Sequence, residues 1–437
     1  MAGNEEVGVR PADVTGPEPV DLPPGPALRP PPVRPRARHT IGPKAQAWWT
    51  RNRHGLLVAT VGTVGLRVIT EWVGLVSQYG TSFPHQVARH PSLLSQVWGH
   101  WDAGWYLSIA EHGYAGRVVG HGQFPDGIAF APLYPLGIRV VHAVTPFNWQ
   151  ASAELLSAIA LFVSLAALHR LAVIHGSRDI GTAATTMLLV FPTAFFLLAP
   201  YPESLSLALV TLALLSAESD HWLLAGVLAA ASTMTKYYLV ILAVALCVEV
   251  WRRHTPKHEE GARRRWIGDV APYLYVAIPS MLVFGGWMIY QQAHFGDPLA
   301  FVHAQAAQWH RHLTAPWTLA HRTVSDLIHL RFLDTSTSSV TELFDTVSVV
   351  LLAVAAVYLY LRTSKPFGVL LGLAFCVFTF QSLLLSVTRE LLVFAPLFLA
   401  LGIWTAERRW LERVVLVLSI PCGYFLVQRF VTGAFAG

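Results

Sequence analysis

The sequence has few charged residues and few cysteines, and these shortages exclude several classes of protein. Asp, Glu, Lys and Arg make up 13% of its 437 residues, against about 25% in soluble globular domains. The three cysteines have no CxxC spacing, so they indicate neither a disulfide framework nor a redox motif. The formal net charge is only +5, and no Walker or Rossmann glycine loop occurs. These features exclude a soluble enzyme, a disulfide-stapled secreted module and a nucleic-acid-binding domain.

Much of the chain consists of long apolar runs. Hydrophobic residues make up 54% of the chain, and the mean hydropathy is +0.46. Runs of roughly 15 to 25 residues match the ~30 Å hydrocarbon core of a bilayer, so we predict an all-α polytopic membrane protein with about 11 transmembrane helices. The predicted spans are 56–78, 151–175, 180–199, 203–218, 221–234, 237–251, 267–291, 342–361, 367–386, 391–405 and 413–433.

Residues 1–50 differ in composition from the rest of the chain, because 11 of the 28 prolines lie before residue 44. A segment so poor in apolar residues and so rich in proline is predicted to be a disordered tail. Residues 51–437 form the predicted membrane domain. Several arginines at the end of the tail adjoin the first span, and basic residues favour the cytoplasmic side, so we place the N-terminus in the cytoplasm.

The segment 128–147 decides the topology, because every later loop changes side if it crosses the membrane. It contains two prolines near its start, which interrupt a helix. If it does not span, the later arginine-rich loops all lie in the cytoplasm with the N-terminus. We therefore predict that it does not span. Two long loops, 79–150 and 292–340, then face the outside of the cell.

The stretch from Trp98 to Tyr114 is the most informative part of the first outer loop. Pro91 suits the start of a helix and Gly113 its end, which predicts one helix between them. Its tryptophans recur at helical spacing and are typical of a helix that lies in the membrane interface. Asp102 lies off the tryptophan face, toward protein or water. The alternative interpretation is a solvated carboxylate on an amphipathic helix.

Four groups of residues then occur in an order that is typical of one family. They are His100-Trp101-Asp102 with Tyr106, Gly113-Tyr114 and Phe130–Pro135; Pro192–Leu205; Phe295–Trp309; and Arg389 with Phe394–Phe398. Together they resemble the PIG-V family, GPI mannosyltransferase II and its bacterial relatives, within the GT-C glycosyltransferase superfamily. The resemblance covers residues from about 60 to 430 and leaves out only the proline-rich tail.

The resemblance implies a GT-C-type bundle whose large first extracytoplasmic loop carries interface helices. It also implies an inverting transfer of a sugar, with mannose as the expected sugar, from a polyprenyl-phosphate donor on the outer face of the membrane. Asp102 matches the loop carboxylate that serves as base in such enzymes. We further assign substrate or phosphate contacts to His100, Trp101, Tyr106, Glu203, Lys236 and Arg389.

Other polar residues have simpler interpretations. Lys236 and Arg389, with Arg117, lie on the predicted outer face, where they can stabilise a departing lipid phosphate; the alternative for the first two is a helix-end residue that reaches the headgroups. Glu111 and Asp126 are interpreted as surface carboxylates.

Two further sets of residues are interpreted without a role in the reaction. Arg67 and Glu71 are one helical turn apart and are predicted to pair. The outer histidines fit no zinc spacing, so we predict no metal site and no cofactor apart from the lipid-linked sugar, which is a substrate.

The leading functional hypothesis is therefore a multi-pass glycosyltransferase of the cell membrane with an extracytoplasmic active site. Its predicted partners are the polyprenyl-phosphate sugar donor, a glycolipid or other extracytoplasmic acceptor hydroxyl, and membrane lipids, with no nucleic acid. Two alternatives remain open. A transporter or lipid flippase would suit a similar number of spans, although transporters often have inverted repeats, and none is visible here. The other is an inactive GT-C-like scaffold.

Overall fold

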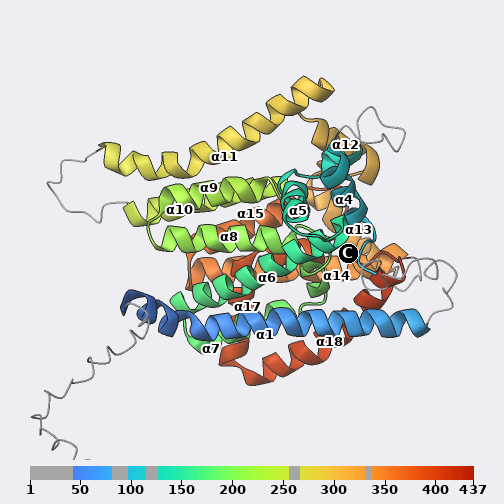
Figure 1. Cartoon of the computed structure of the whole chain (residues 1–437), viewed down its shortest axis with the longest axis horizontal. Helices are drawn as coiled ribbons and strands as arrows, with labels where there is room; N and C mark the ends of the chain where they lie inside the picture. The colour runs from blue at the N-terminus through green and yellow to red at the C-terminus, as the bar shows by residue number, and fades with distance from the viewer. Residues whose placement is uncertain (1–42, 81–96, 115–125, 255–265, 330–336) are drawn as a thin grey trace, which may run out of the picture. The chain divides into compact units, whose positions relative to one another are not determined.

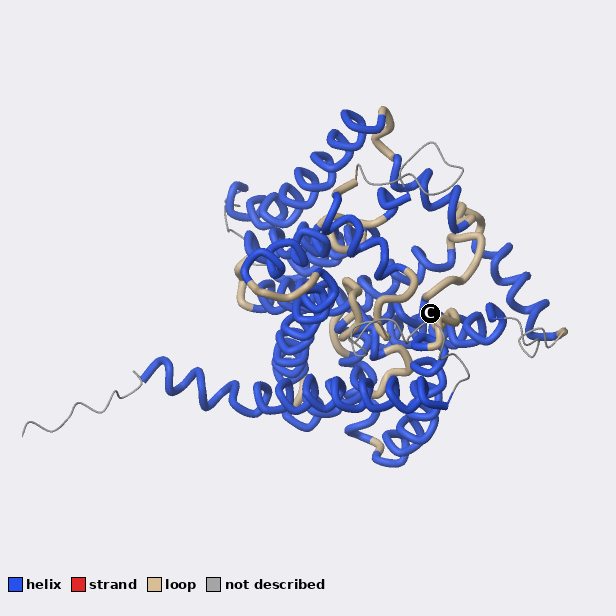
Figure 2. Tube along the Cα trace, turned by 45° about the vertical axis from the view of Figure 1, so that its right-hand side comes forward, coloured by secondary structure: helices blue, strands red, loops and turns tan. Residues whose placement is uncertain are grey.

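The part of the chain that the structure describes consists of helices and the loops that connect them. This computed structural model describes residues 43–80, 97–114, 126–254, 266–329 and 337–437. The chain divides into two units, Met1–Trp48 and Trp49–Gly437, and the second contains the helix bundle and the candidate site. Within the described residues the extended backbone is limited to one isolated bridge, between Leu313 and Gln381 (Figure 2). The all-α prediction is confirmed.

Five helices of the described residues are long and apolar enough to cross a membrane. They are α1 (Pro43–Gly80), α6 (Trp149–Ile174), α11 (Trp266–Phe295), α14 (Thr337–Arg362) and α18 (Arg409–Val431). The number rises to six if Val387–Val393 and Ala395–Glu407, which meet at 89°, are counted as one span. The protein is therefore a multi-pass membrane protein.

Shorter helices complete the bundle. They are α7 (Arg178–Leu189), α8 (Glu203–Glu218), α9 (Trp222–Thr233), α10 (Ile241–His254), α15 (Lys365–Thr379) and α17 (Ala395–Glu407). At 1.5 Å per residue even the longest of them extends only about 24 Å, less than the ~30 Å of hydrocarbon. The count of about 11 spans therefore stays a prediction.

The predicted span 180–199 is wrong as a single helix. Helix α7 ends at Leu189, and the chain resumes only as a short 3-10 turn, η2 (Ala194–Leu197). Pro192 explains the break, because it has no amide hydrogen and disfavours the helical conformation in the residue before it. The break lies at the end of the bundle where the candidate site forms.

The boundary of the predicted tail is also wrong by several residues. Helix α1 begins at Pro43, so residues 43–50 are helical although the sequence placed them in a disordered tail. Proline suits the first turn of a helix, where its missing amide hydrogen is not needed, and the residues that follow contain no further proline. Residues 1–42, which make up the remainder of the predicted tail, lie outside the described residues.

Local capping and close helix packing explain the regular part of the bundle. Asn148 caps α6 by accepting a hydrogen bond from the Ala151 amide, and Ser177 caps α7 in the same way. Gly402 of α17 lies against the backbone of Ala184 in α7, where a Cβ atom would come within 2.7 Å of its amide nitrogen. Small residues of this kind let membrane helices approach closely.

Four helices gather at one end of the bundle, on the right in Figure 1: α4 (Asp102–His112), α5 (Leu133–Val144), α12 (Ala300–Trp309) and α13 (Pro316–Ile328). The Tyr134 hydroxyl bonds Ser157 and so ties α5 to α6. Helix α5 carries most of the segment 128–147, and its 12 residues extend only about 18 Å. Helices α7 and α9, which lie in predicted spans, are equally short, so the non-spanning of this segment stays a prediction.

The predicted helix between Pro91 and Gly113 is wrong at its start. Helix α4 begins only at Asp102, and Trp101 just before it has a positive φ of 56°. Trp98 is 2% exposed whereas Trp101 is 51% exposed, so the tryptophans do not form one face of a helix. Trp98 packs on Phe195 and Phe430 instead. Pro91 itself lies outside the described residues.

Candidate active site

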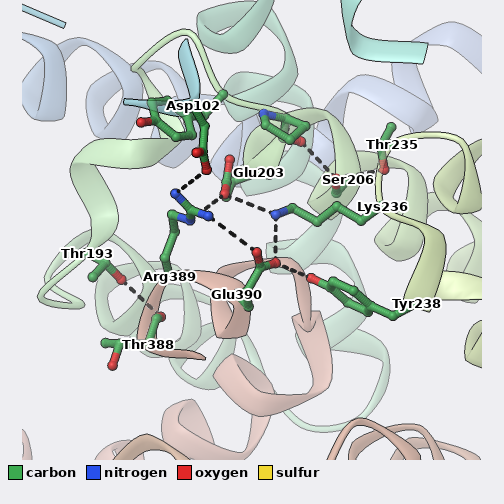
Figure 3. Close-up of polar contacts among 12 residues, drawn as sticks. Asp102, Thr193, Glu203, Ser206, Thr235, Lys236, Tyr238, Thr388, Arg389 and Glu390 are labelled. Atoms are coloured by element: carbon green, nitrogen blue, oxygen red, sulfur yellow. Dashed lines mark hydrogen bonds and ion pairs between the residues drawn. The ribbon is translucent and has the colours of Figure 1, made fainter. Parts of the chain in front are cut away.

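Five charged side chains from four separate segments meet at the end of the bundle near α4 (Figure 3). We call them the five-charge cluster: Asp102, Glu203, Lys236, Arg389 and Glu390. Asp102 and Glu203 are the first residues of α4 and α8. Lys236 precedes the 3-10 turn η3 (Tyr237–Val240), and the last two residues belong to the short helix α16 (Val387–Glu390).

The two cations are shared among the three carboxylates. Arg389 Nη1 lies 3.0 Å from Asp102 Oδ2, and its Nε lies 3.3 Å from Glu203 Oε1. Lys236 Nζ lies 3.2 Å from the same Glu203 oxygen and 2.6 Å from Glu390 Oε2. The Tyr238 hydroxyl also donates to Glu390. Glu203 therefore bridges both cations, and the five side chains form one connected network.

Each charged residue of the cluster lies where a helix starts or stops, and prolines help to place these breaks. Pro200 and Pro202 precede Glu203, while Lys236 follows the end of α9. Broken helices leave backbone groups without intrahelical partners, and nearby hydroxyls satisfy some of them. The Ser206 hydroxyl lies 2.8 Å from both the Pro202 carbonyl and Thr235 Oγ1 and shares its one proton between them, which joins two of the breaks.

A buried carboxylate on α14 holds the segment that carries Arg389. Asp345, 2% exposed, accepts hydrogen bonds from the backbone amide and from the hydroxyl of Thr388, both at 2.8 Å. The Thr193 hydroxyl donates to the carbonyl of the same threonine at 3.1 Å. These bonds fix the backbone directly before Arg389, so the position of its guanidinium depends on α14.

The three carboxylates of the cluster differ in their access to solvent. The Asp102 side chain is 22% exposed, that of Glu390 10% and that of Glu203 0%. Glu203 Oε2 is buried without a hydrogen-bond partner. With all five groups ionised, the carboxylates outnumber the cations by one negative charge. A buried charge is tolerated only when it is paired, and of the three carboxylates Asp102 is the one that another molecule reaches most readily.

Aromatic rings line the cluster. The Arg389 guanidinium lies 5.3 Å from the ring centroids of both Phe196 and Tyr201, at a distance typical of a cation–π contact. Tyr106 packs edge-on against Tyr134 and Tyr201. Burial, with the nearby charges of Glu203 and Asp102, raises the pKa of Tyr106 well above its usual value, so its hydroxyl stays protonated.

The residues before Asp102 contact the site less directly. The His100 carbonyl accepts a hydrogen bond from the Tyr201 hydroxyl at 2.8 Å, and its ring packs edge-on against Phe430. Burial lowers the pKa of His100, so the imidazole is neutral near pH 7. Trp101 is half exposed and packs on Phe435. Their assignment to substrate contacts stays a prediction.

The structure brings together Asp102, Glu203, Lys236 and Arg389, which lie far apart in the sequence. The interpretation of Lys236 and Arg389 as headgroup anchors is wrong, because their side chains are only 7% and 9% exposed and pair with carboxylates. Glu203 is fully buried, so it reaches a substrate only through the two cations in this conformation.

The remaining candidate residues lie away from the cluster or outside the described residues. Glu111 is exposed on α4, as expected of a surface carboxylate. Arg117 and the side chain of Asp126 are outside the part of the chain that the structure describes, so their predicted roles stay untested.

Sequence reasoning missed Glu390, Asp345 and Arg311 of the site region. Asp345 lies in a predicted span, and an ionisable residue inside a membrane segment is itself a sign of function. Glu390 follows Arg389 directly, between two apolar runs. Arg311 carries no such signal, because it lies in a polar loop. Within the described residues no group of three or more His, Cys, Asp or Glu side chains is placed to hold a metal ion.

A second set of charges lies between α1 and α6, and we call it the α1–α6 cluster. Arg67 Nη2 lies 2.6 Å from Glu71, which confirms the predicted pair, and 2.6 Å from Glu154. Trp98 Nε1 donates to Glu71 at 3.1 Å. Gln150 donates to Glu154. This cluster therefore also supports the chain that leads to Asp102.

Three comparisons with known proteins complete the description of the site. A family model described as mannosyltransferase (PIG-V) matches residues 70–296, just over half of the chain, and this range contains Asp102, Glu203 and Lys236. No curated protein matches the sequence. A solved structure, the archaeal oligosaccharyltransferase AglB from Archaeoglobus fulgidus in complex with an inhibitory peptide and a dolichol-phosphate, is 11% identical, with a TM-score of 0.44. The alignment covers 89% of this chain and 57% of that one, so the chain spans little more than half of its length.

Proposed function

Because the chain belongs to the mannosyltransferase (PIG-V) family and is a membrane glycosyltransferase, we propose that it transfers mannose from a polyprenyl-phosphate donor. The acceptor is a hydroxyl of a glycolipid or of another extracytoplasmic molecule. Asp102 is the base, and the reaction inverts the configuration of the sugar. The proposal gives the protein a place in the cell membrane, with the N-terminus in the cytoplasm and the active site on the opposite face.

The observation that carries the proposal is the accessibility of Asp102 within an otherwise closed network of charges. Its side chain is the most exposed of the three cluster carboxylates, at 22%. An ion pair with Arg389 orients the carboxylate. A base must come within hydrogen-bond reach of the proton that it removes, and the fully buried Glu203 cannot do so without a rearrangement.

The proposed reaction is a single displacement. The acceptor oxygen attacks the anomeric carbon of the sugar while Asp102 takes the hydroxyl proton. The bond between the anomeric carbon and the phosphate oxygen breaks, and its electron pair leaves with the polyprenyl phosphate. No electrons are exchanged with a cofactor, so the lipid-linked sugar is the only activated component that the proposal requires.

The cations of the cluster are proposed to act on the phosphate side. Preorganised positive charge stabilises a leaving group whose negative charge grows in the transition state. Arg389 contacts Asp102 directly, and both Arg389 and Lys236 are paired with Glu203 and Glu390. The proposed base and the two cations that are proposed to bind the donor phosphate therefore belong to one network of ion pairs.

The neighbouring polar and aromatic residues are proposed to contact the sugar. His100, Trp101 and Tyr106 come from the same segment as Asp102, so they share its approach to the donor. A neutral imidazole and a protonated phenol can both hydrogen-bond a sugar hydroxyl.

The direct test is transfer from radiolabelled polyprenyl-phosphate mannose in membranes that contain the full-length protein. Labelled product is expected with the wild type and not with Asp102→Asn. Membranes without the protein provide the background. If wild-type membranes give no product with mannose but do so with another polyprenyl-phosphate sugar, the sugar assignment is overturned and the transferase assignment stands. Product from a nucleotide-sugar donor alone would overturn the donor class.

A further inference from the structure

Arg311 is a partly buried cation close to the five-charge cluster, and among the described residues its hydrogen-bond acceptor is a backbone carbonyl. It lies in the loop between α12 and α13, directly after His310, which has a positive φ of 53°. Its Nη2 donates to the Leu385 carbonyl at 2.7 Å. Its Nε is buried without any hydrogen-bond partner.

The backbone around Arg311 is fixed on both sides. The Ser382 hydroxyl donates to the His310 carbonyl at 2.9 Å, and the Ser382 amide donates to the His312 carbonyl at 2.9 Å. Leu313 and Gln381 form an isolated antiparallel bridge. The loop is thus paired with the segment that leads into α16, so the guanidinium is held in place by a built structure.

The electrostatic surroundings of Arg311 differ from those of the other two cations. Arg389 and Lys236 each contact carboxylates within 4 Å, whereas Arg311 forms no such ion pair within the described residues. Its side chain is partly buried, with Nε fully enclosed, and this burial lowers its pKa. The charges of Glu390, Arg389, Asp102 and Asp345 act on it from beyond ion-pair distance. A buried charge without a counter-ion is unfavourable, so an anion that enters the site relieves this penalty.

We infer that Arg311 binds the phosphate of the lipid-linked donor, together with Arg389. The inference rests on the proposed function and names a further residue for it. A guanidinium carries N–H donors in one plane, and two of them can bind two phosphate oxygens at once. Among the described residues, Arg311 uses Nη2 for the hydrogen bond to the Leu385 carbonyl. The five-charge cluster alone has a net negative charge and repels an anion. Arg311 adds a third cation to this region, where the buried carboxylate of Asp345 is already occupied by two hydrogen bonds from Thr388.

The chemistry of the leaving group explains why an additional cation is needed. The donor phosphate is a diester with one negative charge. When its bond to the anomeric carbon breaks, the phosphate oxygen keeps the electron pair and the proton of the acceptor goes to Asp102. The polyprenyl phosphate therefore leaves as a monoester with two negative charges. Arg311 stabilises the second charge because its donors have no carboxylate to satisfy.

The test measures binding and turnover in the full-length protein purified in detergent. Arg311→Gln removes the charge, Arg311→Lys keeps the charge without the planar fork, and Arg322→Gln is the control. Arg322 lies on the neighbouring helix α13 with a 54% exposed side chain. Equilibrium binding of a short-chain polyprenyl phosphate is measured first, followed by kcat and the KM values for donor and acceptor.

We expect Arg311→Gln to weaken polyprenyl-phosphate binding by about 10- to 100-fold, as for loss of a hydrogen bond to a charged group. Its kcat/KM for the donor falls by about 10²- to 10³-fold, while the KM for the acceptor does not change. Arg311→Lys recovers part of both losses, and Arg322→Gln behaves as the wild type.

Wild-type affinity for polyprenyl phosphate in Arg311→Gln overturns the inference. If Arg311→Gln does not fold, Arg311→Lys decides: unchanged binding in that variant overturns the inference, and weaker binding supports it. If the wild type transfers no mannose at all, the proposed function fails, but the binding measurements still decide the role of Arg311.

Discussion

The two buried charge clusters contain similar residues in different backbone settings. In the α1–α6 cluster, Arg67 pairs with Glu71 and Glu154, and all three project from uninterrupted helices. In the five-charge cluster every residue lies at a helix start, a helix end or in the four-residue helix α16. Uninterrupted helices hold their charges in one arrangement. Separate segments bring their charges together only through tertiary packing, and each can contact a ligand from its own side. We therefore assign a structural role to the α1–α6 cluster and a catalytic role to the five-charge cluster.

The largest effect is expected at the base. Asp102→Asn keeps the size of the side chain but cannot take up the proton, so turnover should fall by about 10²- to 10⁴-fold with little change in donor KM. Steady-state kinetics with polyprenyl-phosphate mannose measures this split. Glu111→Gln, an exposed carboxylate of the same helix, is the control and should keep near wild-type turnover. Equal losses in both variants would indicate a folding defect of this segment instead.

The next-largest effect is expected on the stability of the fold. Lys236→Met leaves Glu203 and Glu390 without the ammonium group that both contact, so the free energy of unfolding should fall by about 3–5 kcal/mol. Denaturant unfolding in detergent measures this change. Lys365→Met removes an exposed lysine at the start of α15 and should leave stability unchanged. A Lys236→Met protein as stable as the wild type would show that the network does not need its second cation.

A smaller effect is expected where a residue acts through another. Asp345→Asn replaces the carboxylate oxygen that accepts both hydrogen bonds from Thr388 by a neutral amide oxygen, and the weaker bonds let Arg389 shift relative to Asp102. Misplacement of a catalytic group by about 1 Å can lower the rate by up to about 10²-fold, and we expect a loss in kcat between tenfold and that limit. Thr346→Val, which removes a hydroxyl that bonds the Glu342 carbonyl of its own helix, is the matched control. Unchanged kcat in Asp345→Asn would remove this positioning role.

The smallest effect on activity is expected in the α1–α6 cluster. The triple variant Arg67→Met, Glu71→Gln, Glu154→Gln removes all its charges and keeps an acceptor for Trp98. Neutral replacement of a whole buried ion cluster is often neutral or stabilising by about 1–4 kcal/mol, so turnover should stay within about threefold of wild type. Arg67→Met alone should be strongly destabilised. A tenfold or larger loss of turnover in the triple variant would contradict the distinction between the two clusters.

The regular helices of the bundle could be predicted from the sequence because their signal is local. Apolar runs placed α6 and α8 within about two residues of their observed ends, and the spacing of Arg67 and Glu71 predicted their contact. The start of α4 could not be predicted in this way. The tryptophan spacing predicted that Trp98 lies on the helix. Trp98 instead packs between Phe195 and Phe430, which are distant in sequence, and it lies before the helix begins.

The candidate site could be predicted only in part. The family resemblance and the topology identified Asp102, Glu203, Lys236 and Arg389, but neither gave their contacts with one another. Glu390 and Arg311 were missed because their importance depends on segments that meet only in the folded chain. The sequence shows that a residue is charged, whereas its partner is determined by packing.

The shared position of Glu203 has a consequence for the evolution of the site. One oxygen of this carboxylate is within 3.3 Å of both Lys236 and Arg389, so a mutation that neutralises either cation also disturbs the other. The loss of one cation adds a further uncompensated negative charge in a buried place, and this intermediate is unstable. Descendants that lack Lys236 are therefore expected to have changed Glu203 or Glu390 at the same time, so that these positions should vary together across relatives.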